Sequence, residues 1–86
     1  MQVYLHKKFE KQYRKLPKVL RDKTDSVLKL FYVDPFDPKL KNHALSGNLI
    51  GKRAVSVTGD VRIIFEEHND HTVVLMLNIG KHSRVY

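Results

Sequence analysis

A cluster of helix-breaking residues at Asp34, Pro35, Asp37 and Pro38 divides this chain into two parts with different hydrophobic patterns. Before the cluster, apolar residues recur at the three- and four-residue spacing that is typical of amphipathic helices. After it, runs rich in Val, Ile, Leu and Phe alternate with turn residues, a pattern typical of antiparallel strands. The chain is therefore expected to pack helices against a sheet.

The part before the breakers predicts a short strand and two helices. Residues 2–5 predict the strand, and Phe9 and Tyr13, four residues apart, then mark the apolar face of a first helix. Pro17 interrupts that pattern and is well placed in the first turn of a second helix, which ends near Val33. We therefore expect a helical hairpin.

The part after the breakers begins with a segment, residues 39–48, that has no periodicity and predicts a loop. Three strands joined by tight turns are then predicted at residues 53–57, 61–67 and 72–79. Gly80 marks a bend, and the last residues could add a final extended segment. The expected fold is a single α+β domain over residues 1–86, with the strand and the helical hairpin packed on one face of a three- or four-stranded antiparallel sheet.

The composition narrows the environment in which such a domain works. At 86 residues the chain can build only one core. It contains no cysteine, which excludes disulfides and thiolate metal sites and is unusual for a small secreted domain. The N-terminal residues are too charged for a signal peptide, and no apolar run reaches membrane-spanning length. We expect a cytoplasmic protein without a membrane partner.

The charge of the chain predicts a polyanionic partner. Sixteen Lys and Arg residues against nine Asp and Glu residues give a net charge of +7. Residues 1–30 contain nine basic and three acidic side chains, so the helical half carries six of these seven charges. Basic residues with few acids between them repel one another, a cost that phosphate binding would explain. RNA, bound on the open face of the sheet, is the expected partner.

Several side chains could cleave RNA without a metal ion. If the 2′-hydroxyl of the RNA attacks the adjacent phosphorus, the protein need supply only a base, an acid and a cation. His82 and Tyr86 in the C-terminal segment, His43 in the loop and Arg62 in the second predicted strand suit these roles. Without further information, the same residues are also consistent with a frayed tail, a solvated turn and a surface ion pair.

The other histidines give little indication of a catalytic or metal-binding role. His68 and His71 could form a metal pair, but beside two glutamates at a hairpin tip they are more simply explained as a polar turn. His6, directly before the first helix, is expected to cap that helix or to lie on the surface.

Four motifs together resemble a known family. They are His43-Ala44-Leu45-Ser46-Gly47, Gly51-Lys52-Arg53-Ala54-Val55, Gly59-Asp60-Val61-Arg62-Ile63-Ile64-Phe65 and the ending Ile79-Gly80-Lys81-His82-Ser83-Arg84-Val85-Tyr86. In this order and spacing the whole chain resembles the RelE/ParE superfamily of bacterial toxins, and within it the YafQ-like messenger-RNA interferases.

The resemblance implies an endoribonuclease that enters the ribosomal A site, cuts messenger RNA without metal or cofactor, and is neutralised by a cognate antitoxin. The catalytic positions that it implies are His43, Asp60, Arg62, His82 and Tyr86. The accompanying RNA-binding positions are Lys52, Arg53, Lys81 and Arg84. In this scheme His82 is the general acid, and His43 or Asp60 is the base.

The chain departs from the YafQ pattern at three positions. Ser56 stands where the pattern has a second histidine, Val61 where it has a tryptophan, and Asn78 where it has an arginine. Two other hypotheses stay open, and the changes at Ser56 and Asn78 favour only the second. One is a ParE-like protein that poisons DNA gyrase and catalyses nothing, and the other is an inactive RNA- or ribosome-binding module.

Overall fold

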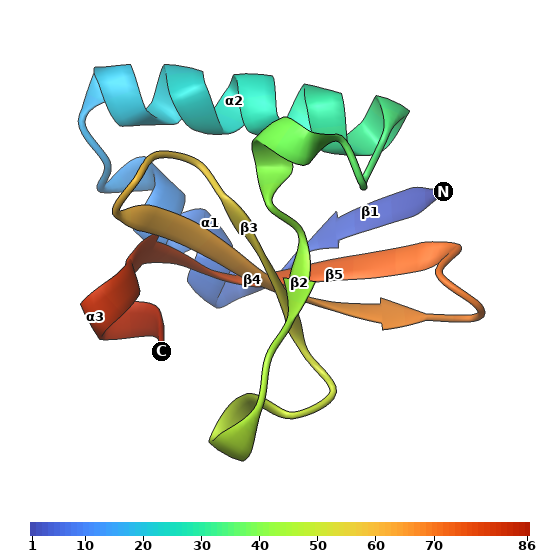
Figure 1. The fold of residues 1–86 in the computed structure, drawn as a ribbon. Helices are drawn as coiled ribbons and strands as arrows, with labels where there is room; N and C mark the ends of the chain where they lie inside the picture. Colours follow the sequence, from blue (N-terminus) through green and yellow to red (C-terminus); the bar gives the residue numbers. More distant parts are fainter.

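The computed structural model describes the backbone of residues 1–86 and every side chain except that of Arg84. Its elements, shown in Figure 1, are β1 (Gln2–Leu5), α1 (Lys7–Arg14), α2 (Lys18–Val33), the 3₁₀ turn η1 (Pro38–Leu40), β2 (His43–Ala44), the 3₁₀ turn η2 (Gly47–Leu49), β3 (Arg53–Ser56), β4 (Val61–His68), β5 (Val73–Lys81) and α3 (His82–Val85). The predicted α+β class, the two helices and the three main strands are confirmed.

The sheet is larger than expected. It has five strands in the order β1-β5-β4-β3-β2, where the sequence predicted three or four antiparallel ones. β1 pairs in parallel with β5 along the edge of the sheet, with Gln2 opposite Val73 and Leu5 opposite Met76. Hydrophobic periodicity identifies a strand but not its neighbour, so it could not reveal this pairing. The fifth strand, β2, is too short to produce a pattern.

Local signals set the bounds of the two helices. The ring of His6 caps α1, because its Nδ1 accepts a hydrogen bond from the Lys8 amide at 3.0 Å, one of the two roles that its position predicted. Pro17, with a φ of −57°, directly precedes α2 and separates it from α1. No described helix is long and apolar enough to cross a lipid bilayer.

The hydrophobic core lies between the two long helices and one face of the sheet. Phe9 of α1 and Phe31 of α2 are each 1% exposed and pack on the strand residues of that face. The rings of Phe31 and Phe65 meet edge to face with centroids 5.1 Å apart. Val55 and Ile63 point into the same core from neighbouring strands. Because side chains alternate along a strand, the residues next to each of these in sequence face the opposite side of the sheet.

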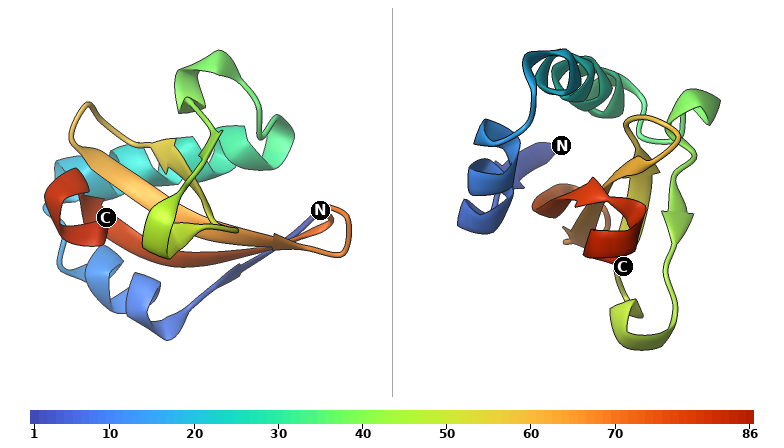
Figure 2. Two further views of the ribbon diagram at one scale, coloured as in Figure 1. Left: turned by 60° about the horizontal axis from the view of Figure 1, so that its bottom comes forward. Right: turned by 90° about the vertical axis from the view of Figure 1, so that its left-hand side faces the viewer.

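The sequence predicted that this opposite face would be open, but it is covered. Ala54 and Ile64 lie on it and are completely buried. The C-terminal residues form α3 rather than an extended segment, and α3 packs on β4 and β5. A Cβ at position 80 would lie 3.2 Å from the Val85 side chain, a tight contact, so a side chain there would press on α3. Figure 2 shows α3 on the side of the sheet away from α2.

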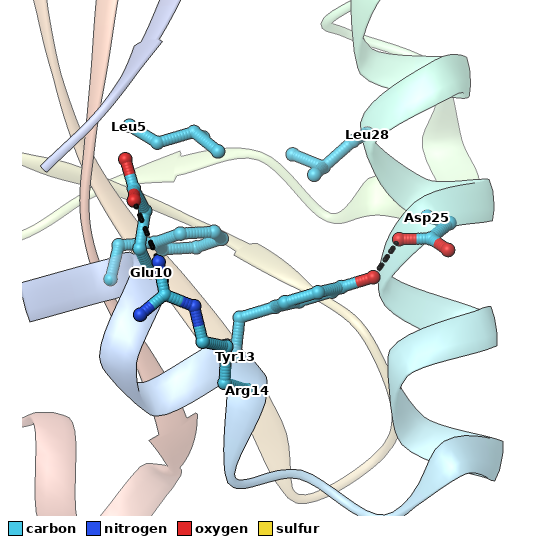
Figure 3. A pocket seen from close by; sticks show the side chains of 7 residues that line it. Leu5, Glu10, Tyr13, Arg14, Asp25 and Leu28 are labelled. Carbon is cyan, nitrogen blue, oxygen red and sulfur yellow. Dashed lines mark hydrogen bonds and ion pairs between the residues drawn. The ribbon is translucent and has the colours of Figure 1, made fainter. Parts of the chain in front are cut away.

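A hollow lies between α1 and α2 on the core side of the molecule (Figure 3). Its walls include Leu5, Phe9 and Leu28, and the Tyr13 hydroxyl spans it to donate a 2.7 Å hydrogen bond to Asp25. That bond is the largest cause of the raised pKa of Tyr13, because it favours the protonated phenol. Tyr13 thus ties the first helix to the second.

Replacing Phe31 by Ala should lower the free energy of unfolding by about 3–5 kcal/mol, since it removes a buried ring and leaves a cavity beside Phe65. Chemical denaturation measures the change. Tyr32→Ala is the matched control, because the neighbouring ring is 59% exposed and its loss should cost far less. Equal losses in the two variants would contradict the assigned core.

Candidate active site

His43 reaches the α3 side of the sheet through β2. It pairs with Ala54 of β3, and cross-strand partners share a face, so its side chain lies opposite the hydrophobic core. The Leu45 amide donates to the Lys52 carbonyl at 2.9 Å and closes the segment that follows. The lack of periodicity predicts a loop around His43, but His43 lies in a two-residue strand at the edge of the sheet.

A backbone contact assigns the tautomer of His43. Its Nδ1 lies 2.8 Å from the carbonyl oxygen of Lys41. Because a carbonyl oxygen only accepts hydrogen bonds, Nδ1 carries the hydrogen, and in the neutral ring Nε2 keeps its lone pair. This Nε2 lies 3.4 Å from the Tyr86 hydroxyl, a distance at which the hydrogen bond is weak. The ring therefore presents a basic nitrogen toward α3.

The single turn of α3 places His82 and Tyr86 together. The amide of Tyr86 donates to the His82 carbonyl at 3.2 Å, and the two rings stack at a tilt with centroids 4.1 Å apart. The His82 amide donates to the carbonyl of Asp60 at 2.8 Å, which fixes the start of α3 on the turn between β3 and β4. His43, Tyr86 and His82 thus form one continuous row of side chains.

Arg62 lies beside this row. It stands between Ser56 of β3 and Gly80 of β5 on the face that carries His43, and its Nη1 donates to the Thr58 carbonyl at 2.7 Å. Burial raises the pKa of the Tyr86 phenol above its usual 10.0, and the positive charge of Arg62 partly opposes that rise. The positive charge of Arg62 therefore favours the ionised form of the Tyr86 phenol.

A shallow pocket of about 360 Å³ opens next to His43. It is lined by the Tyr86 ring and by residues of the segment 43–49. In this segment Gly47 has a φ of +63°, a conformation that side chains disfavour, which gives a reason for the glycine in the histidine motif. The volume lies near the lower limit for small-ligand pockets, about 300 Å³.

Two polar atoms on this face are buried without a hydrogen-bond partner among the described residues: Ser56 Oγ and Asn78 Oδ1. Ser56 lies opposite Arg62, and Asn78 lies opposite Ile64. In the sequence both appeared only as departures from the YafQ pattern, and nothing in the sequence indicated that they would be buried without partners. A buried polar atom without a partner lowers the stability of the fold. Such atoms are found where a ligand or an ordered water completes the hydrogen bonding.

The other predicted site residues lie around the row. Asp60 is exposed in the turn that holds α3, and Lys81 is exposed at the start of α3. Lys52 is half-buried just before β3. The side chain of Arg84 lies outside the described residues.

Arg53 lies on the other face of the sheet, opposite Phe65. Its Nε donates to Asn42 Oδ1 at 2.8 Å and lies 3.8 Å from a carboxylate oxygen of Glu67, and its guanidinium sits 5.7 Å from the centre of the Phe36 ring. Motif spacing had grouped Arg53 with the RNA-binding residues. Strand alternation would have placed it opposite its neighbours, but sequence alone does not say which face carries the site.

The histidines at the β4–β5 hairpin pair with carboxylates. His71 lies 3.0 Å from Glu67, and His68 lies 3.8 Å from Glu66. In the part of the chain whose side chains are described, no three His, Cys, Asp or Glu residues are grouped as metal ligands.

Comparison with known proteins decides the family. The model of a family described as the YafQ bacterial toxin of type II toxin-antitoxin systems matches residues 1–86. The chain belongs to this family. Its fold is similar to YafQ from Escherichia coli BL21(DE3), with a TM-score of 0.82 and 17% identity over 99% of this chain and 97% of that one.

Two complexes contain the same fold. YafQ in the E. coli DinJ-YafQ toxin-antitoxin complex matches with a TM-score of 0.79 and 18% identity, covering 99% of this chain and 96% of that one. A chain of the archaeal RelE-RelB complex from Pyrococcus horikoshii matches with a TM-score of 0.76 and 22% identity, covering 98% of this chain and 97% of that one. A search of curated proteins found no significant match to this toxin.

Arg62→Met should raise the pKa of Tyr86 further above 10.0, because it removes the positive charge that favours the phenolate. The ¹³C chemical shift of the ring carbon that bears the hydroxyl, followed against pH, reports this value. Arg14→Met is the control, since Arg14 pairs with Glu10 on α1. An unchanged pKa of Tyr86 in Arg62→Met would show that the charge of Arg62 does not act on the Tyr86 hydroxyl.

Proposed function

We propose that this toxin is an endoribonuclease that acts in the cytoplasm and cleaves messenger RNA on the ribosome by attack of the RNA 2′-hydroxyl. The observation that carries the proposal is the basic Nε2 of His43, which faces the Tyr86 hydroxyl, while the Tyr86 ring stacks on His82. The mechanism needs no metal ion, because side chains supply the base, the acid and the cation.

The geometry favours His43 over Asp60 as the base. The Lys41 carbonyl holds the ring in the tautomer in which Nε2 accepts a proton. The Tyr86 hydroxyl occupies the position that the RNA 2′-hydroxyl would take, and its weak contact is readily exchanged. Asp60 instead contributes its backbone carbonyl, which anchors α3.

The reaction then proceeds as one displacement at phosphorus. His43 Nε2 removes the proton of the 2′-hydroxyl, and the 2′-oxygen forms a bond to the adjacent phosphorus. The bond from phosphorus to the 5′-oxygen breaks, and protonated His82 donates its proton to that oxygen. The products are a 2′,3′-cyclic phosphate and a 5′-hydroxyl end.

The remaining residues bind the RNA. Arg62 stabilises the phosphate as negative charge develops on it, since it lies next to the row of catalytic side chains. Tyr86 stacks on the base beside the cut, over the pocket formed with segment 43–49. Lys52 and Lys81 attract neighbouring phosphates, and we keep Arg84 in this set on its sequence position alone.

We also propose that a cognate antitoxin neutralises this chain. The net charge of +7 favours an acidic partner, and a relative with the same fold was solved in a toxin-antitoxin complex. Such a partner would inhibit cleavage by covering α3 or the segment that carries His43.

Purified bacterial ribosomes programmed with messenger RNA test the nuclease. Wild type should produce cuts with 5′-hydroxyl ends, and a 2′-deoxy nucleotide at the cut position should prevent them, because the nucleophile is missing. His82→Ala should lower the cleavage rate by about 10²–10⁴-fold. His68→Ala is the matched control, since His68 is exposed at the hairpin tip.

Absence of cuts with wild-type protein would overturn the proposal. Inhibition of DNA gyrase in a supercoiling assay would then identify a gyrase poison, whereas salt-dependent RNA binding alone would identify a binding module. Cleavage at an unchanged rate in His82→Ala would show that His82 is not the general acid.

A further inference from the structure

The strand that carries His43 needs an anchor from elsewhere in the protein. β2 has only two residues, and both pair with β3 alone, so few ladder hydrogen bonds hold it. The preceding Lys41 has a φ of 51°, a left-handed conformation that costs roughly 1–2 kcal/mol for a residue with a side chain. Yet the carbonyl of Lys41 is the group that assigns the His43 tautomer.

Asn42, between these two residues, supplies the anchor. Its Nδ2 donates to the Pro35 carbonyl at 2.9 Å, and its Oδ1 accepts from Arg53 Nε at 2.8 Å. The side chain therefore ties the chain just before His43 both to the loop after α2 and to β3. The backbone of Arg53 also pairs with Ala44, the residue just after His43.

Arg53 is itself held in place. The Glu67 carboxylate beside it is only 11% exposed, so the attraction is weakly screened by water. The Phe36 ring lies under the guanidinium. We call Arg53, Asn42 and Glu67 the Arg53 clamp. Arg53 lies on the opposite face of the sheet from the catalytic row, and among the described side chains no hydrogen bond or ion pair joins the clamp to His82 or Tyr86.

We propose that the Arg53 clamp positions the catalytic base: Arg53 and Asn42 hold the Lys41 carbonyl against His43 Nδ1 and so keep Nε2 free to accept a proton. The catalytic consequence rests on the nuclease function proposed above, but the effect on the His43 ring does not. Arg53 is then a positioning residue, which explains an arginine in the motif without giving it contact with RNA.

The test compares Asn42→Ala and Arg53→Met with Tyr13→Phe. The control removes a hydrogen bond of similar length, 2.7 Å, between α1 and α2, far from His43. ¹⁵N NMR of the neutral His43 ring should show the Nδ1–H form in wild type and Tyr13→Phe. In the two clamp variants we expect a larger share of the Nε2–H form, because the Lys41 carbonyl no longer holds the hydrogen on Nδ1.

Cleavage on programmed ribosomes gives the second readout. The clamp variants should lose about 10- to 100-fold in kcat, because the base is misplaced, with KM unchanged because no RNA contact is removed. A purely structural role would instead lower Tm without changing the tautomer. If Arg53→Met fails to fold, Asn42→Ala alone tests the proposal, since Asn42 is a half-buried loop residue whose replacement disturbs the fold less.

Unchanged tautomers in both clamp variants would overturn the inference, and so would an equal change in Tyr13→Phe. A rise in KM at constant kcat in Arg53→Met would also overturn it, because that result would mean direct RNA binding. If wild type cuts no RNA while the clamp variants alone change the tautomer, the positioning stands and the proposed nuclease function fails.

Discussion

The antiparallel pairing of β4 with β5 is the constraint on which both halves of the candidate site depend. It runs from Val61 opposite Lys81 to His68 opposite Val73, the longest ladder of the sheet. At one end the chain leaves β5 beside the turn that holds Asp60, whose carbonyl receives the first amide of α3. At the other end Glu67 reaches Arg53 and, through it, the segment before His43. One hairpin therefore fixes the position of His82, the proposed acid, and helps to fix that of His43, the proposed base.

The two faces of the sheet differ, since one makes the hydrophobic core and the other carries the candidate site. On the face under α1 and α2, aromatic and aliphatic side chains exclude water and make the core. The face under α3 is also covered, but it contains Arg62 and two buried atoms, Ser56 Oγ and Asn78 Oδ1, that have no hydrogen-bond partner among the side chains that the structure describes. Unpaired polar atoms are destabilising, and proteins commonly accept this cost where function requires it. The asymmetry supports binding of a polar ligand on the α3 face.

The sequence predicted the features that depend on local pattern. Pro17 and the breakers from Asp34 to Pro38 separated the helices and the sheet, and the position of His6 before α1 predicted a cap or a surface residue, of which the cap is observed. Features that depend on contacts distant in sequence were not predictable. These are the parallel pairing of β1, the short β2 and the helical turn that folds the C-terminus back, since none leaves a periodic signal. The motifs selected His43, Arg62, His82 and Tyr86, which the fold brings together, but grouped them with Arg53, which it places on the other face.

A double-mutant cycle tests most directly the claim that β2 and α3 build one catalytic site. Cleavage of messenger RNA on programmed ribosomes would be measured for His43→Ala, His82→Ala and the double variant. Residues that act as base and acid in one displacement give strongly non-additive losses. The account predicts that the double variant cleaves about as slowly as the slower single variant. Losses that multiply would contradict it, because they would show that His43 and His82 act independently.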